Sequence, residues 1–133
     1  SLMIIKESID LHSCGISQYI LNEYLEDEEK YEKHLQEIRD DYAKKANFFC
    51  EQLDKYLPEF KYEKPKGGMF LYGSFEGIDS FALVQKCIEQ KVVYVPGNQF
   101  YIDKVPNGEI RFNYTHSTFE QIERGIKLIK NCL

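Results

Sequence analysis

The sequence has no apolar segment near the roughly 20 residues that a membrane-spanning helix needs, and its start lacks the pattern of a signal peptide. Basic residues are in the minority, because 17 Lys and Arg stand against 22 Asp and Glu, for a net charge of −5. No basic patch offsets this excess of acid. These absences disfavour a nucleic acid or an acidic membrane as a partner, and they predict a soluble, cytoplasmic protein.

Metal-ligand and disulfide spacings are also missing. The cysteines are far apart and form no Cys-x-x-Cys pair, and the histidines form no pattern such as His-Glu-x-x-His, so we predict no metal site. Three cysteines fall on or beside the apolar stripes of expected helices, which favours buried free thiols over disulfides. The cysteines are Cys14, Cys50, Cys87 and Cys132, and the last three are the ones on or beside such stripes. The histidines are His12, His34 and His116.

The length of 133 residues and the hydrophobic content of 43% predict one domain. Ser1 and Leu2, which precede Met3, are expected to be left over from cloning, so we assign the domain to residues 3–133. The sequence contains no repeat, low-complexity tract or linker. Its beginning has no clear cap or turn and reads like a segment from the middle of a longer protein.

Apolar residues at spacings of three and four predict four helices. The expected ranges are about 16–26, 27–57, 80–90 and from 118 to the C-terminus, whereas residues 3–14 show no clear period. Asp27 and Asp79 are placed to begin the second and third of these helices. Ser117-Thr118-Phe119-Glu120 is expected to be a capping box that begins the last one.

Four short segments are expected to be strands, at residues 60–63, 69–75, 92–95 and 110–114. Residues 69–75 are apolar throughout, as in a strand that is buried on both faces. Gly67 and Gly68 before it indicate either a hairpin turn or a close neighbour. The order of elements predicts an α+β fold, a small, mostly antiparallel sheet of about four strands with helices packed on one face.

Arg111 is the leading candidate for a functional residue. Residues 110–114 alternate between apolar and polar, which places Arg111 and Asn113 on the polar face of a half-buried strand. A guanidinium fixed on a strand presents a planar set of donors that fits a carboxylate or phosphate. A surface arginine paired with a neighbouring acid is the alternative, and the strand pattern alone favours it.

Three motifs in order resemble the C-terminal small domain of fold-type I, pyridoxal-phosphate-dependent aminotransferases, in the class I/II group and its aminoadipate/kynurenine-like branch. They are Pro-Lys-Gly-Gly-Met-Phe-Leu-Tyr at 65–72, Val-Val-Tyr-Val-Pro-Gly-Asn-Gln-Phe at 92–100 and Ile-Arg-Phe-Asn-Tyr at 110–114. Residues 8–13 and 16–20 resemble the stretch that follows the cofactor lysine in that family, and residues 123–126 resemble its last helix. The resemblance covers essentially residues 3–133.

The resemblance implies transfer of an amino group between an amino acid and a 2-oxo acid, in amino acid metabolism or biosynthesis, by a parent protein that is a homodimer and uses pyridoxal 5'-phosphate. It implies that Arg111 binds the substrate α-carboxylate, and this favours the functional interpretation of that residue. Asn113, which shares the polar face, and Gly68 are weaker candidates for substrate binding. Phe100 is expected to belong to the core.

The family's Schiff-base lysine has no counterpart here, since Lys6 lies beyond the position where it would be. We therefore expect that the large cofactor-binding domain precedes this segment, and that the segment alone has no catalytic or cofactor-binding residue and is inactive. Two alternatives stay open, namely the effector-sensing, aminotransferase-like domain of a bacterial transcription regulator and a stand-alone module that binds small ligands. The substrate, the choice between transamination and elimination or decarboxylation, and the oligomeric state of the segment do not follow from the sequence.

Overall fold

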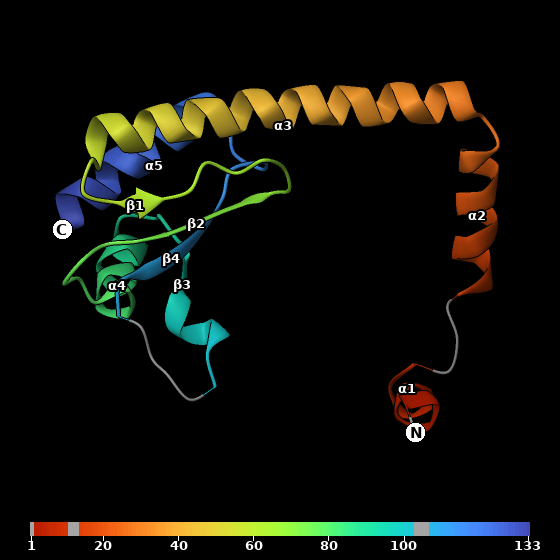
Figure 1. Ribbon diagram of the computed structural model, residues 1–133, viewed down its shortest axis with the longest axis horizontal. Helices are drawn as coiled ribbons and strands as arrows, with labels where there is room; N and C mark the ends of the chain where they lie inside the picture. Colours follow the sequence, from red (N-terminus) through yellow and green to blue (C-terminus); the bar gives the residue numbers. More distant parts are fainter. Residues whose placement is uncertain (1, 11–13, 103–106) are drawn as a thin grey trace. The chain divides into compact units, whose positions relative to one another are not determined.

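The computed structural model describes residues 2–10, 14–102 and 107–133, so Ser1, His12 and Pro106 lie outside the described residues (Figure 1). The chain divides into two units, residues 1–39 and 40–133. The first unit contains α1 (Leu2–Ile9), α2 (Gly15–Leu25) and the beginning of α3 (Glu28–Tyr56). Within the described ranges, no helix is both long and apolar enough to cross a membrane.

Helices α1 and α2 have no buried residue, although both are rich in apolar side chains. Helix α1 was not predicted, because its apolar and polar residues do not alternate with a helical period. Helices α2 and α3 lie where the sequence predicts them. A side-chain oxygen of Asp27 accepts the amide hydrogen of Lys30 over 3.0 Å, which confirms the role expected for Asp27 at the start of α3.

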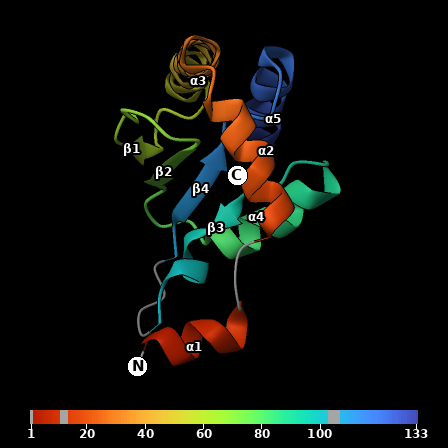
Figure 2. The same cartoon turned by 90° about the vertical axis from the view of Figure 1, so that its right-hand side faces the viewer.

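The second unit is built on a four-stranded antiparallel sheet, which confirms the predicted fold class. The strands are β1 (Lys61–Tyr62), β2 (Phe70–Ser74), β3 (Val95–Pro96) and β4 (Glu109–Asn113). Their order across the sheet is β1-β2-β4-β3, so β4 lies between β2 and β3 (Figure 2).

Helices cover one face of this sheet. The covering helices are α3, α4 (Ser80–Glu89) and α5 (Phe119–Cys132). Helices α3 and α5 lie together on one side of the strands (Figures 1 and 2). Their apolar sides and the inward residues of β2 and β4 form the core: Ala46, Phe49, Cys50, Leu53, Leu71, Leu83, Val84, Cys87, Ile110, Phe112, Ile122, Ile126 and Ile129. All four cysteines are free, and Cys50 and Cys87 are buried as expected, whereas Cys132 is half-buried and Cys14 is exposed.

The starts of α4 and α5 depend on side-chain caps. The carboxylate of Asp79 accepts the amide hydrogens of Phe81 and Ala82, as predicted. The expected capping box at Ser117 is wrong by one residue, because Thr118 is the N-cap and Gln121 the reciprocal partner.

Two strand predictions are corrected. Residues 69–75 are not buried on both faces, because the side chains of Phe70 and Tyr72 are each 41% exposed on the face without helices. The expected strand at 92–95 pairs only from Val95 onward. The backbone amide of Val92 instead donates to the carbonyl of Cys87 over 3.0 Å, at the turn that ends α4, and the preceding Lys91 has a φ of 61°.

Candidate functional site

The register of the sheet fixes the surroundings of Arg111. On β4, Arg111 is paired with Tyr72 of β2 on one side and with Val95 of β3 on the other. Directly paired residues of antiparallel strands point to the same face. The neighbours of Arg111 on β4, Ile110 and Phe112, are buried among the helices. Arg111 therefore points away from the core, to the face without helices, as the alternation predicted.

Two phenyl rings lie against the guanidinium of Arg111. Its central carbon is 4.4 Å from the centre of the Phe70 ring and 4.7 Å from the centre of the Phe100 ring. Phe70 comes from β2, and Phe100 comes from η1 (Gly97–Phe100), the 3-10 helix that follows β3. The negative faces of aromatic rings attract a guanidinium and restrict its movement. The cation is thus held on one side by β2 and on the other by η1.

No carboxylate among the described residues pairs with Arg111. The ion pairs in the described part of the chain involve other residues. Its Nε atom is buried and has no hydrogen-bond partner there. A buried donor without a partner is costly, and an external acceptor would remove that cost. The surface ion pair that the strand pattern favoured is therefore not seen among these residues.

Glu109 lies two residues before Arg111 on β4, and its carboxylate has other partners. One oxygen accepts a hydrogen bond from the hydroxyl of Tyr72 over 2.8 Å, and the other accepts from the hydroxyl of Tyr101 over 3.3 Å. Gly97 leaves room for this contact, since a Cβ atom there would overlap the Cβ of Glu109. The cluster thus joins β2, β4 and the segment after η1.

Burial raises the pKa of the Tyr72 hydroxyl above its ordinary value, and its hydrogen bonds with Glu109 and Tyr101 raise it further. An unperturbed tyrosine has a pKa of about 10. The hydroxyl of Tyr72 therefore keeps its proton at neutral pH and serves as a donor to Glu109.

An open hollow of about 420 Å³ adjoins the guanidinium and is lined by Tyr72, Phe100, Tyr101 and Arg111. Its lining combines one cation with three aromatic rings. Such a surface suits a small molecule that has one carboxylate and an apolar or planar remainder. Among the described residues, the lining includes no Ser, Cys, His, Lys, Asp or Glu, so we assign binding and orientation to these side chains.

The weaker candidates from the sequence do not line this hollow. The side-chain oxygen of Asn113 accepts the amide hydrogens of Thr115 and His116, over 3.0 and 3.2 Å, and so supports the turn after β4. Gly68 has a φ of 81° in the turn before β2, and its carbonyl accepts a hydrogen bond from Tyr114. Local structure thus accounts for both residues, and their contact with a substrate stays a prediction.

Sequence reasoning missed most of the side chains around Arg111. The prediction that Phe100 is a core residue is wrong, because it is 44% exposed and covers the guanidinium instead. Extending the alternation of β4 by one residue would have placed Glu109 on the face of Arg111. Tyr72 could have been placed there only if the pairing of β2 with β4 had been known. For Tyr101 no signal in the sequence indicated its contact with Glu109.

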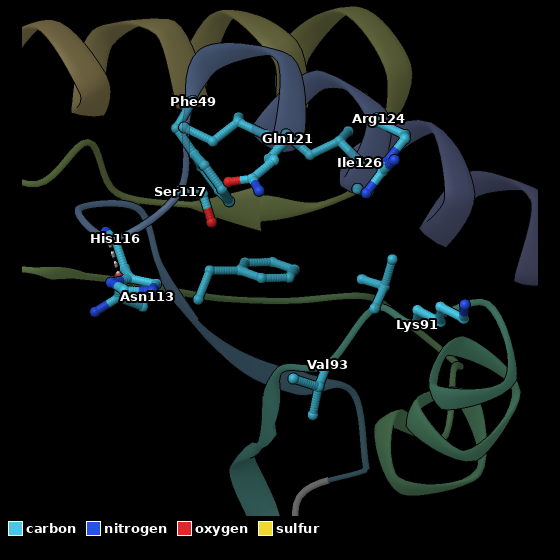
Figure 3. A pocket seen from close by; sticks show the side chains of 13 residues that line it. Phe49, Lys91, Val93, Asn113, His116, Ser117, Gln121, Arg124 and Ile126 are labelled. Atoms are coloured by element: carbon cyan, nitrogen blue, oxygen red, sulfur yellow. Dashed lines mark hydrogen bonds between the residues drawn. The ribbon is translucent and has the colours of Figure 1, made fainter.

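A second hollow, of about 330 Å³, lies between α5 and the end of the sheet near β3. Lys91 and Arg124 lie at one end of it, and His116 and Asn113 lie at the other (Figure 3). The side chains of Lys91, His116 and Arg124 are exposed to solvent, so they form no desolvated and oriented site comparable to that of Arg111. In the described part of the chain, no group of His, Cys, Asp and Glu could hold a metal ion.

Solved structures of similar fold are aminotransferases. The α-aminoadipate aminotransferase of Thermus thermophilus, complexed with N-(5'-phosphopyridoxyl)-L-leucine, is 27% identical with a TM-score of 0.87, over 97% of this chain and 33% of that one. The kynurenine aminotransferase of Pyrococcus horikoshii is 34% identical with a TM-score of 0.85, over 97% of this chain and 32% of that one.

Curated sequences give the same family. Aromatic-amino-acid aminotransferase 1 of Thermococcus litoralis is 34% identical over 128 residues, which are 95% of this chain and 30% of that protein. The 2-aminoadipate transaminase of Thermus thermophilus is 29% identical, over 96% of this chain and 32% of that protein. This chain therefore spans about a third of the length of the curated relatives it matches. The family model for aminotransferase class I and II matches residues 5–129, so the chain belongs to the class I and II aminotransferases.

Proposed function

We propose that this chain is the C-terminal small domain of a pyridoxal-phosphate-dependent aminotransferase, and that Arg111 binds the α-carboxylate of its substrates. The observation that carries the proposal is the guanidinium itself. Two rings hold it, its Nε atom is buried without a partner among the described residues, and it borders an open hollow. The substrates would be an amino acid and a 2-oxo acid, which share the carboxylate that this site can bind.

The contribution of Arg111 would be orientation as well as affinity. A carboxylate can accept two parallel hydrogen bonds from a guanidinium, and this fixes the plane of the carboxylate and the direction of the bonds at the neighbouring α-carbon. Correct orientation of a reacting bond lowers the entropic part of the barrier. Phe70 and Phe100 would keep the guanidinium in place before the substrate arrives.

The residues around the hollow do not fit the cofactor. Pyridoxal phosphate is held through a lysine amine and supplies the chemistry of amino-group transfer. The described residues that line the hollow include no lysine, and the carboxylate of Glu109, on the same sheet face, already accepts two hydrogen bonds. The groups that hold the cofactor would therefore belong to the remaining two thirds of the length of such an enzyme. We derive no step of its chemistry from this chain.

Arg111→Lys in the full-length protein tests the proposal. Lysine keeps the charge but loses the paired donors. We expect KM to rise at least about tenfold for amino donors and 2-oxo acids alike, with the absorbance of bound cofactor unchanged. Arg124→Lys, an exposed position on α5, is the matched control and should leave KM unaltered. An unchanged KM in Arg111→Lys would contradict the proposal.

Cofactor attachment can be tested on the 133-residue chain. Pyridoxal phosphate is added to it, any imine is reduced with borohydride, and the product is weighed by mass spectrometry. We expect scattered and substoichiometric labelling of exposed lysines. One lysine labelled in full would show that the chain itself holds the cofactor.

The names of the relatives suggest which donors to assay first. They act, by those names, on aromatic amino acids, 2-aminoadipate and kynurenine, and the three rings that line the hollow suit an aromatic side chain.

We further propose that the full-length protein is a cytoplasmic homodimer. Gel filtration and cell fractionation would test these two points.

A further inference from the structure

We propose that the hydroxyl groups of Tyr72 and Tyr101 are positioning groups that hold the carboxylate of Glu109 away from Arg111 and so keep the guanidinium available. The inference rests on the proposed function, because it concerns how the carboxylate site stays open. It assigns a role to a cluster that the binding of the substrate carboxylate does not itself require.

Glu109 is within reach of Arg111. The two residues are two positions apart on β4 and point to the same face of the sheet. A strand rises by about 3.3 Å per residue, so their Cβ atoms are roughly 7 Å apart. Long side chains of opposite charge bridge such a separation. A carboxylate of the protein would then occupy the guanidinium and compete with the carboxylate of a substrate.

The structure directs this carboxylate elsewhere. Both of its oxygens accept hydrogen bonds, one from Tyr72 over 2.8 Å and one from Tyr101 over 3.3 Å. Hydrogen bonds to a charged acceptor are stronger than those between neutral groups. Among the described residues, Glu109 makes no ion pair with Arg111. The tyrosines thus satisfy the negative charge without neutralising the cation.

The sheet fixes the position of Tyr72, the donor with the shorter hydrogen bond. Tyr72 is the direct cross-strand partner of Arg111, so its hydroxyl is held by the register of the sheet. Gly97 leaves room for the hydrogen bond between Tyr72 and Glu109. A Cβ atom at Gly97 would overlap the Cβ of Glu109 and would also lie 2.9 Å from the Tyr72 hydroxyl oxygen. The Tyr72 hydroxyl is protonated at neutral pH, as an ordinary tyrosine with a pKa of about 10 would be, and burial raises its pKa further. The arrangement therefore exists before any ligand binds.

Removing both hydroxyl groups should let Glu109 turn to Arg111. An ion pair at this partly exposed site would be worth up to about 1 kcal/mol, so the apparent affinity for a competing carboxylate would fall about fivefold. In the full-length protein, the double variant Tyr72→Phe, Tyr101→Phe should therefore raise KM about fivefold, with little change in kcat. Adding Glu109→Gln removes the competing charge and should return KM to within about twofold of its original value.

The matched control is Tyr62→Phe. Its hydroxyl also donates to a carboxylate, that of Asp54 over 2.8 Å, but it lies on β1, which pairs with β2 and not with β4. This variant should leave KM unaltered. If KM stays raised after Glu109→Gln is added to the double variant, the tyrosines act through structure alone and the inference is overturned.

A second readout does not depend on activity. The chain has three arginines, Arg39, Arg111 and Arg124, so the Nε–H nuclear magnetic resonance signal of Arg111 can be assigned in the 133-residue chain by its loss in Arg111→Lys. We expect this signal to shift in the double tyrosine variant and to return when Glu109→Gln is added. An unshifted signal would overturn the inference. If the signal behaves as expected but Arg111→Lys leaves KM unchanged, the proposed function fails while the role of the tyrosines stands.

Discussion

The hydroxyl of Tyr114 donates a hydrogen bond of 2.7 Å to the backbone carbonyl of Gly68. The backbone amide of Tyr114 also donates to the carbonyl of Met69 over 3.3 Å. These two bonds join the turn before β2 to the end of β4, next to the pairing of Phe70 with Asn113. The register that places Tyr72 opposite Arg111 is therefore fixed at one end by a buried tyrosine.

Gly68→Ala tests the importance of this turn. Gly68 has a φ of 81°, in the left-handed region where a Cβ atom costs about 1 kcal/mol or more. We expect the free energy of unfolding to fall by about that amount, as measured by urea denaturation. Gly67→Ala is the control, because Gly67 is not in that region and a Cβ atom there would meet no other atom within 4 Å. Equal effects of the two substitutions would contradict the prediction.

The start of α5 gives a prediction about the capping register. Thr118 accepts the amide hydrogen of Gln121 over 3.2 Å, and the side chain of Gln121 accepts the amide hydrogen of Thr118 over 2.9 Å. Thr118→Ala should therefore lower the free energy of unfolding by about 1 kcal/mol. Ser117→Ala, the cap that the sequence favoured, should change it by less than about half of that. If Ser117→Ala lowered the free energy of unfolding more than Thr118→Ala did, in thermal or urea unfolding, Ser117 would be the N-cap, as the sequence predicted.

Helices α3, α4 and α5 were the easier part of the fold to predict from the sequence. The apolar stripes of α3, α4 and α5 repeat over many residues, and the charged residues between them leave little ambiguity about which side is buried. Asp79 was identified as a cap because a short acceptor side chain directly precedes such a stripe. The error of one residue at Thr118 arose because Ser117 and Thr118 are adjacent and either can serve as a cap.

The environment of Arg111 could be predicted only in part. Alternation along β4 shows which face Arg111 is on, since that signal is local. Its partners depend on the pairing of β2 with β4, which are 35 or more residues apart in sequence, and on the path of η1. Phe100 illustrates the difficulty, because an apolar side chain that covers a guanidinium has the same sequence signature as one in the core.

Alkaline pH should destabilise the fold through its buried tyrosines. Burial raises the pKa of the buried Tyr94 and Tyr114 and of the half-buried Tyr62 in the folded chain. The unfolded chain loses these protons at about pH 10, before the folded chain does. The stability that they contribute is therefore complete below about pH 10 and is lost as the pH rises further.

Tyr94→Phe should reduce this pH dependence. The ring of Tyr94 is 5% exposed, and its hydroxyl donates to the carbonyl of Ser80 over 2.9 Å. Above about pH 10 the free energy of unfolding should fall less steeply in this variant, by up to about 1.4 kcal/mol per pH unit. Urea denaturation at several alkaline pH values measures the slope. Tyr19→Phe, at a side chain that is 78% exposed, should leave the slope as it is.

Phe100→Leu tests whether the rings around Arg111 prepare the site for its ligand. Leucine keeps an apolar side chain but loses the attraction between the ring and the guanidinium, which is worth about 0.5–1 kcal/mol at an exposed site. In the full-length protein, KM for amino donors should therefore rise about two- to fivefold. The thermal midpoint should change little, because Phe100 is 44% exposed.

The control for this substitution is Phe81→Leu. Phe81 is 49% exposed on α4, and no interaction of its ring with a guanidinium occurs among the described residues, so it reports the effect of losing an exposed phenyl ring alone. Its KM should match that of the unchanged protein. If both variants raise KM equally, the rings do not act on Arg111. If only Phe100→Leu does so, the guanidinium needs its aromatic support to bind a carboxylate well.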